Sequence, residues 1–167
     1  MSSLTFYIIQ AIFDVIVLGL ICAAAKTDGK ERIVKPWTQW ALLGASIAHF
    51  AFILTAFLTG FEDLALMDVL NYPISGIMMF TIYIVLVLVF KKGIGGADTK
   101  VTSIMAFYLG LFPSVIMIIF HFLAAMVYVG YQWVKNKKRI ASVPLMIYIG
   151  IGYIAALIFQ WIAVILK

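Results

Sequence analysis

Long apolar runs constrain this chain more than any other feature. The 167 residues are 65% hydrophobic and 11% charged, whereas an ordinary soluble domain is about 25% charged. A globule of this size cannot hide so much apolar surface from water. A bilayer core of about 30 Å is crossed by about 20 helical residues, and clear runs of that length cover residues 4–25, 37–58, 70–90 and 143–166. We therefore predict an all-α integral membrane protein with one membrane-embedded domain over residues 1–167 and no soluble domain.

The distribution of charge predicts how often the remaining segment, residues 101–134, crosses the membrane. Three connections are basic, whereas the connection at 59–69 carries only acidic residues. Basic loops belong on the cytoplasmic side, so an even number of crossings must separate them. Residues 101–134 should then form two helices of about 15 residues each, slightly short for a span, with a turn near residues 110–114. The prediction is a bundle of six transmembrane helices in the cell membrane, with the basic loops in the cytoplasm.

Other features fit an ordinary multi-pass protein. The N-terminal run has no preceding basic residue, so we expect it to stay as an anchor and not be cleaved as a signal peptide. Cys22 is the one cysteine; it cannot form an internal disulfide, and we expect it to be a buried structural residue. Aromatic residues near span ends are predicted interfacial anchors: Trp37, Trp40, Tyr131, Trp133 and Trp161. Three glycines are expected to allow close helix packing: Gly44, Gly150 and Gly152.

The chain has only seven acidic residues, and two of them stand at the cytoplasmic boundary. Glu31, Glu62, Asp63 and Asp68 fit solvated loops. Asp28 is expected just after the first helix and Asp98 just before the fourth, each with a lysine two residues later. They could be solvated or helix-capping residues, since a helix N-terminus favours aspartate. They could equally form a two-aspartate hydrolase site, in which one carboxyl keeps its proton and the pair activates a water without a metal or cofactor.

The segment "GIGGADTKVTSIMAFYLGLFPS" resembles the second catalytic motif of type IV prepilin peptidases and archaeal preflagellin peptidases, the GxGD-type membrane aspartyl proteases. Gly95, Gly96, Ala97 and Asp98 match that motif, and Lys100 matches a lysine common in the family. "DGKERIVKPW", beginning at Asp28, is similar to the first motif. The resemblance covers nearly the whole chain.

The resemblance implies an aspartic endopeptidase with catalytic Asp28 and Asp98, an active-site turn shaped by Gly95 and Gly96, and a charge environment influenced by Lys100. Its implied substrate is the short basic leader of a pilin-like or archaellin precursor, cut at the cytoplasmic face of the membrane. The chain lacks the cysteine-rich segment of many bacterial members, so we expect no methyltransferase activity. Besides that precursor, the expected partner is the lipid bilayer; no nucleic acid, metal or cofactor is expected.

Two alternatives come from other residues. Asp14 lies in the middle of the first span, where a carboxylate is costly and points to a function or a specific partner. With His49 and His121 it could belong to a proton-coupled transporter or channel, although no inverted repeat is visible. Alternatively, Asp14 is a hydrogen-bonded structural residue, or lies in a water-filled cavity, and the histidines are packed residues. A non-catalytic subunit of a membrane assembly is the second alternative.

Overall fold

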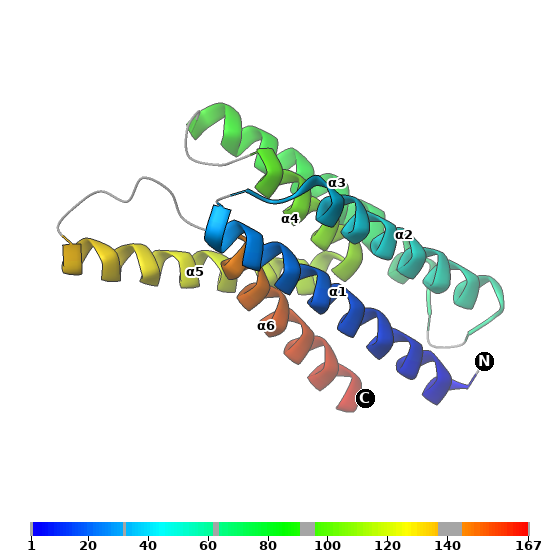
Figure 1. Cartoon of the computed structure of the whole chain (residues 1–167). Helices are drawn as coiled ribbons and strands as arrows, with labels where there is room; N and C mark the ends of the chain where they lie inside the picture. Colours follow the sequence, from blue (N-terminus) through cyan, green and yellow to red (C-terminus); the bar gives the residue numbers. More distant parts are fainter. Residues whose placement is uncertain (1, 32, 62–63, 91–95, 137–144, 167) are drawn as a thin grey trace.

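A computed structural model describes residues 2–31, 33–61, 64–90, 96–136 and 145–166. These residues form six helices and no strand (Figure 1). In chain order they are α1 (Ser3–Glu31), α2 (Pro36–Leu58), α3 (Leu66–Phe90), α4 (Gly96–Leu109), α5 (Leu111–Asn136) and α6 (Leu145–Ile165). The prediction of an all-α fold is confirmed.

Five of these helices are long and apolar enough to cross a membrane, and α4 is not among them. With 14 residues, α4 is about 21 Å long, shorter than the hydrocarbon core. The break in the segment 101–134 falls at Gly110, inside the predicted turn, where φ is +78°. The prediction of two equal short helices is wrong, because the following helix, α5, has 26 residues.

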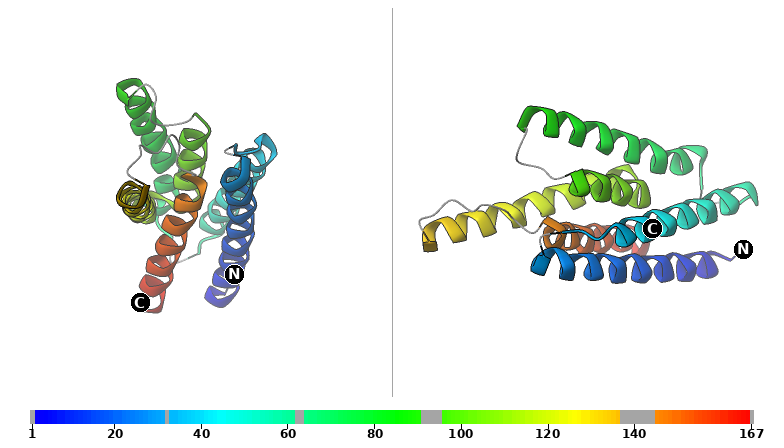
Figure 2. Two further views of the ribbon diagram at one scale, coloured as in Figure 1. Left: turned by 60° about the vertical axis from the view of Figure 1, so that its left-hand side comes forward. Right: turned by 45° about the horizontal axis from the view of Figure 1, so that its top comes forward.

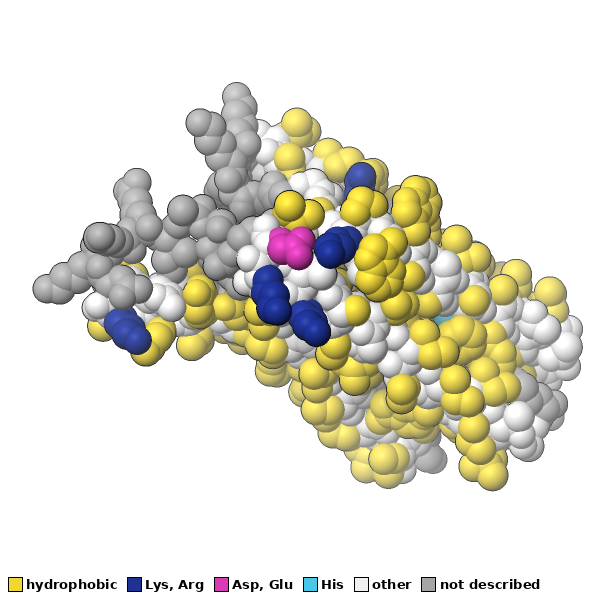
Figure 3. Space-filling view, viewed as in Figure 1, with side chains coloured by type: hydrophobic (Ala, Val, Ile, Leu, Met, Phe, Trp, Pro, Cys, Tyr) yellow, Lys and Arg dark blue, Asp and Glu magenta, His cyan; other side chains and the backbone are white. Residues whose placement is uncertain are grey.

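Six helix ends lie together at one end of the bundle (Figures 1 and 2). The C-terminal ends of α1, α3 and α5 lie there with the N-terminal ends of α2, α4 and α6; we call it the basic end. Both chain termini and the α2–α3 connection lie at the opposite end, here called the terminal end. On the face in Figure 3, lysine and arginine side chains gather toward the basic end and the remaining surface is largely hydrophobic.

The larger of two buried apolar clusters joins α1, α4 and α6 with parts of α2 and α5. Its buried residues include Ile21, Leu42, Met105, Met117 and Ile149. On α1 the buried positions recur every three or four residues, as expected for one face of a helix. Cys22 lies off that face and is exposed, so the prediction that it is buried is wrong.

Close helix contacts explain some of the glycines. A Cβ on Gly152 would collide with the carbonyl oxygen of Met117 on α5, and one on Gly150 would lie 3.2 Å from Ile21 on α1. Both predictions of close packing on α6 are therefore confirmed. A Cβ on Gly44 would meet nothing within 4 Å, so the same prediction for that residue is wrong. Gly76, which the sequence did not single out, packs α3 against Phe107 of α4.

The α4–α5 turn is held by polar side chains of α3. The backbone N–H of Leu111 donates to Oδ1 of Asn71 at 3.3 Å, and the hydroxyls of Ser75 and Ser114 are 2.9 Å apart. These bonds satisfy backbone and hydroxyl groups that would otherwise be costly inside a bundle. They fix the turn against the middle of the bundle.

Candidate functional site

Asp28 lies in the last turn of α1, because α1 continues to Glu31 and does not end near Ala25. The expectation that Asp28 follows the helix is therefore wrong. Its side chain is 7% exposed, and its Oδ2 accepts the backbone N–H of Met146 at 3.0 Å. Asp28 thus caps the first turn of α6, where free N–H groups and the helix dipole favour a carboxylate.

Asp98 lies in the first turn of α4, because that helix begins at Gly96. It is half-buried, and Ala97 beside it packs against the common core. A Cβ on Gly96 would meet nothing within 4 Å, so there is open space beside the start of α4. Gly95 lies outside the described residues.

Asp28 and Asp98 belong to the same end of the bundle, the basic end (Figures 1 and 2). Their helices share one core, but no Cα atom of α1 lies within 8 Å of a Cα atom of α4. The two aspartates are therefore neighbouring but not adjacent.

Two hydroxyl groups face the bundle interior close to Asp98. Tyr83 on α3 is 1% exposed and Thr102 on α4 is 0% exposed. The Tyr83 hydroxyl interacts with Thr102 as a hydrogen-bonding side chain and with Asp98 through its charge. Among the described residues, however, neither hydroxyl has a hydrogen-bond partner of good geometry. A buried hydroxyl without a partner costs free energy, so these groups are available to a water or a polar ligand beside Asp98. Neither hydroxyl is predicted from the sequence.

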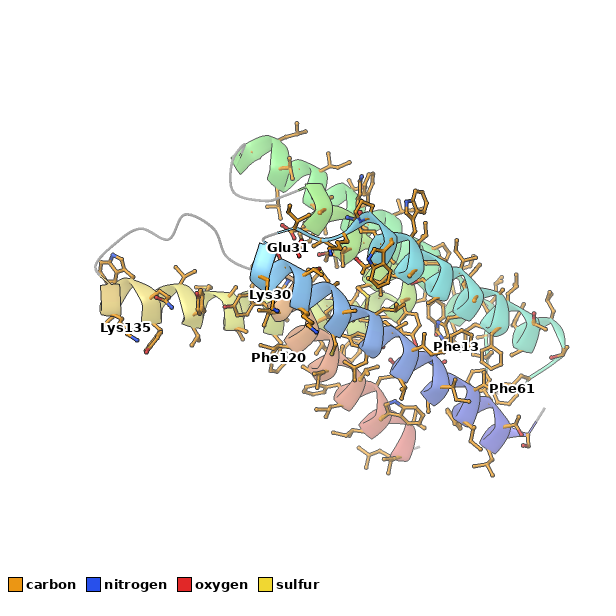
Figure 4. The ribbon with its side chains drawn as sticks, in the orientation of Figure 1. Phe13, Lys30, Glu31, Phe61, Phe120 and Lys135 are labelled. Carbon is orange, nitrogen blue, oxygen red and sulfur yellow. The ribbon has the colours of Figure 1, made fainter. Side chains whose placement is uncertain are left out.

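A groove of about 440 Å³ opens between α2 and α3 beside this region. Its polar side chains are Gln39 of α2 and Lys100 and Ser103 of α4. Pro36, Trp40 and Phe80 contribute apolar surface. Lys100 is exposed, like the charged residues Lys30 and Glu31 at the end of α1 (Figure 4). An extended apolar segment with a polar end would fit a groove of this composition.

Asp14 is the centre of a second polar cluster, deeper in the bundle. It is 4% exposed. Its Oδ1 accepts the Tyr108 hydroxyl at 2.7 Å, and its Oδ2 accepts the indole N–H of Trp161 at 3.0 Å. The Tyr153 hydroxyl donates to the backbone carbonyl of Asp14 at 3.3 Å. Asp14 therefore joins α1 to α4 and α6, which favours the structural interpretation. Trp161 is not simply an interfacial anchor, because its N–H points into the bundle.

Of the two histidines, only His49 is connected with Asp14 among the described residues, through the side chain of Gln10, which hydrogen-bonds with Asp14. Nε2 of His49 donates to Oε1 of Gln10 at 2.7 Å, and its ring lies 4.5 Å from that of Tyr108. His121 is 0% exposed, and neither of its ring nitrogens has a hydrogen-bond partner among the described residues. His49 thus borders the Asp14 cluster, and no described hydrogen bond links His121 to it.

Comparisons with known proteins identify no relative of this chain. No protein-family model matches the chain, and no curated protein and no solved structure is similar to it. Within the described ranges, no group of three histidine, cysteine or acidic side chains could hold a metal ion. The fold and site thus define an all-helical protein with five helices able to cross a membrane and a pair of aspartates at one end.

Proposed function

We propose that the chain is a membrane aspartic endopeptidase of the prepilin and preflagellin peptidase type. The observation that carries the proposal is the position of Asp28 and Asp98, which lie at one end of one bundle on helices sharing a core. The motif around Asp98 and the open space beside Gly96 support the same interpretation. The substrate class is a precursor with a short basic leader followed by an apolar helix, such as a pilin-like or archaellin precursor, cut at the cytoplasmic face.

The proposed reaction needs only the two carboxyl groups and water. One carboxylate takes a proton from a water molecule, whose oxygen attacks the carbonyl carbon of the scissile amide. The other carboxyl, in its protonated form, gives its proton to the amide nitrogen as the carbon–nitrogen bond breaks. The peptide would lie between α1 and α4, whose Cα atoms are not within 8 Å of one another. The buried hydroxyls of Tyr83 and Thr102 would hold the water or the substrate carbonyl near Asp98.

The groove beside Lys100 supports a route for the substrate from the bilayer. Its apolar wall would take the start of the substrate's apolar helix, while the basic leader stays at the membrane surface. The exposed carboxylate of Glu31 forms only a 3.8 Å ion pair with Lys35. It is therefore a suitable matched control for the two candidate catalytic acids at the same end.

The transporter alternative receives less support. Both oxygens of Asp14 are occupied by side-chain donors, and no described hydrogen bond connects His121 with Asp14 or His49. A carboxylate with its acceptors satisfied in this way is typical of a structural residue. In a non-catalytic assembly subunit, Asp28 and Asp98 would need no catalytic role.

The test is cleavage of a pilin-type precursor co-expressed with the full chain, followed as a mobility shift on a gel. We expect cleavage by the wild type and by Glu31→Gln, and none by Asp28→Asn or Asp98→Asn. All four proteins should reach the membrane in equal amounts, measured by immunoblot. Cleavage that survives either aspartate change removes that residue from the proposed pair, and loss of cleavage by Asp14→Asn alone points to another site.

A further inference from the structure

A cavity of about 460 Å³ lies at the terminal end of the bundle, away from Asp28 and Asp98. Its walls come from the ends of α1, α2, α3 and α6, and its inner limit is the α4–α5 turn, with Leu109 and Phe112. The cavity exists because that turn stops short of the terminal end. Its volume is typical of small-molecule sites, which span about 300–1,000 Å³.

Aromatic rings make up much of the lining: Phe6, Tyr7, Phe61, Tyr72, Phe112, Phe159 and Trp161. Phe112 and Phe159 are exposed, whereas the rings at the start of α1 and after α2 pack against each other. Phe6 is only 7% exposed and stacks on Phe61, with ring centroids 4.7 Å apart. Phe61 lies near the N-terminus of the chain in Figure 4. Rings of an interfacial belt point outward to the lipid head groups, whereas the Phe6 ring is buried beside this cavity.

The charge around the cavity is negative. The carboxylate of Asp68 lines it, and no lysine or arginine is among the described lining residues. Asp68 is exposed and also accepts the backbone N–H of Ala65 at 2.8 Å. Next to the cavity lining, the Asp14 carboxylate accepts a hydrogen bond from Trp161, which itself lines the cavity. Aromatic faces carry negative potential and attract cations, most strongly where water is excluded.

We propose that this cavity binds a substituted ammonium group carried on an apolar body. The ammonium would lie against the aromatic faces near Asp68, and the apolar part would fill the space below the α4–α5 turn. Gln10 and Asn71 also line the cavity. Their amide oxygens accept from His49 and Leu111, and the second lone pair of each oxygen would accept from an ammonium that retains protons. The ligand would be either the choline-type head group of a bilayer lipid or a soluble lipophilic amine. The inference does not depend on the proposed peptidase activity, because it uses the other end of the molecule.

The test uses benzyltrimethylammonium as the probe and its uncharged carbon isostere, neopentylbenzene (2,2-dimethylpropylbenzene), as the comparison. Binding to the purified full chain in dodecyl maltoside is measured by isothermal titration calorimetry. We expect saturable binding of the cation by the wild type and by Glu31→Gln. Binding should be weaker by about five-fold or more in Asp68→Asn and in Phe61→Leu, as expected for losing a charge or a cation–π contact. The asparagine keeps an oxygen for the Ala65 N–H, so Asp68→Asn should leave the fold intact.

Nanodiscs distinguish the two sources of the ligand. If a lipid head group occupies the cavity, the probe should bind more weakly in phosphatidylcholine discs than in phosphatidylglycerol discs; equal binding in both assigns the site to a soluble amine. The proposal is overturned if the uncharged isostere binds as tightly as the cation, which would make the cavity a site for lipid tails. It is also overturned if no saturable binding occurs, or if Asp68→Asn and Phe61→Leu bind like the wild type.

Discussion

The Asp14 cluster allows a quantitative test of how the bundle is held together. Replacing Asp14 with asparagine keeps one acceptor oxygen but turns the other into an NH₂ group. One of the two donors, the Tyr108 hydroxyl or the Trp161 N–H, then faces another donor. Hydrogen bonds between membrane helices are worth about 0.6 kcal/mol on average and up to about 1.7 kcal/mol, and an unsatisfied buried donor adds its desolvation cost. We therefore expect Asp14→Asn to lower the free energy of unfolding by about 1–2 kcal/mol.

The assay is reversible unfolding in mixed dodecyl maltoside and dodecyl sulfate micelles, followed by far-ultraviolet circular dichroism. A double-mutant cycle with Tyr108→Phe isolates the bond between these two side chains, and we expect a coupling of about 0.5–1.5 kcal/mol. The control Glu31→Gln removes an exposed carboxylate and should change stability by less than about 0.5 kcal/mol. Asp14→Asn as stable as this control, or no coupling with Tyr108→Phe, would refute the structural role of Asp14.

Three further predictions test other parts of the structure. Gly152→Ala should destabilise the protein by about 1–3 kcal/mol because the new Cβ would overpack against α5. Gly44→Ala, with open space around it, should be neutral or stabilising. Equal effects of the two changes on unfolding in detergent would contradict the close α5–α6 contact. If the proposed peptidase activity is demonstrated, Tyr83→Phe and Thr102→Val should slow precursor cleavage by about ten-fold or more at unchanged unfolding midpoint, and full activity in both would remove these hydroxyls from the site. A nitroxide label on Cys22 should collide freely with oxygen in the bilayer, whereas the same label at position 21, in Ile21→Cys with Cys22→Ser, should be shielded; similar oxygen accessibility at both positions would mean that α1 is rotated.

The sequence predicts the spans well because a span is a property of composition over about 20 residues. It also predicts the break near Gly110, because a glycine followed by a proline within three residues is a strong interruption of a helix. It does not predict that the break leaves unequal pieces. The distribution of basic loops predicts only that residues 101–134 contain an even number of helices. A short α4 with a long α5 satisfies that condition as well as two equal helices do.

The sequence predicts less well which side chains contact one another. Asp28 and Asp98 were found as candidates because carboxylates are rare in this chain, but the backbone bond from Met146 to Asp28 depends on how α6 docks. The bond from Trp161 to Asp14 could not be inferred, because a tryptophan near a span end usually anchors at the interface. The exposure of Cys22 follows from the rotation of α1, and a helix that is apolar all round carries no periodic signal of its rotation.

The shortness of α4 connects the candidate site with the cavity. A helix of 14 residues spans about 21 Å, about 9 Å less than the hydrocarbon core. It therefore leaves the bundle interior unfilled near one end. With α4 beginning at the basic end, Asp98 lies beside the buried hydroxyl of Tyr83, and the unfilled length falls at the terminal end, beneath Leu109 and Phe112. A chain whose α4 crossed fully would have no room for that cavity. Its turn could then no longer be held by Asn71 and Ser75 of α3, so the two sites depend on the same turn at Gly110.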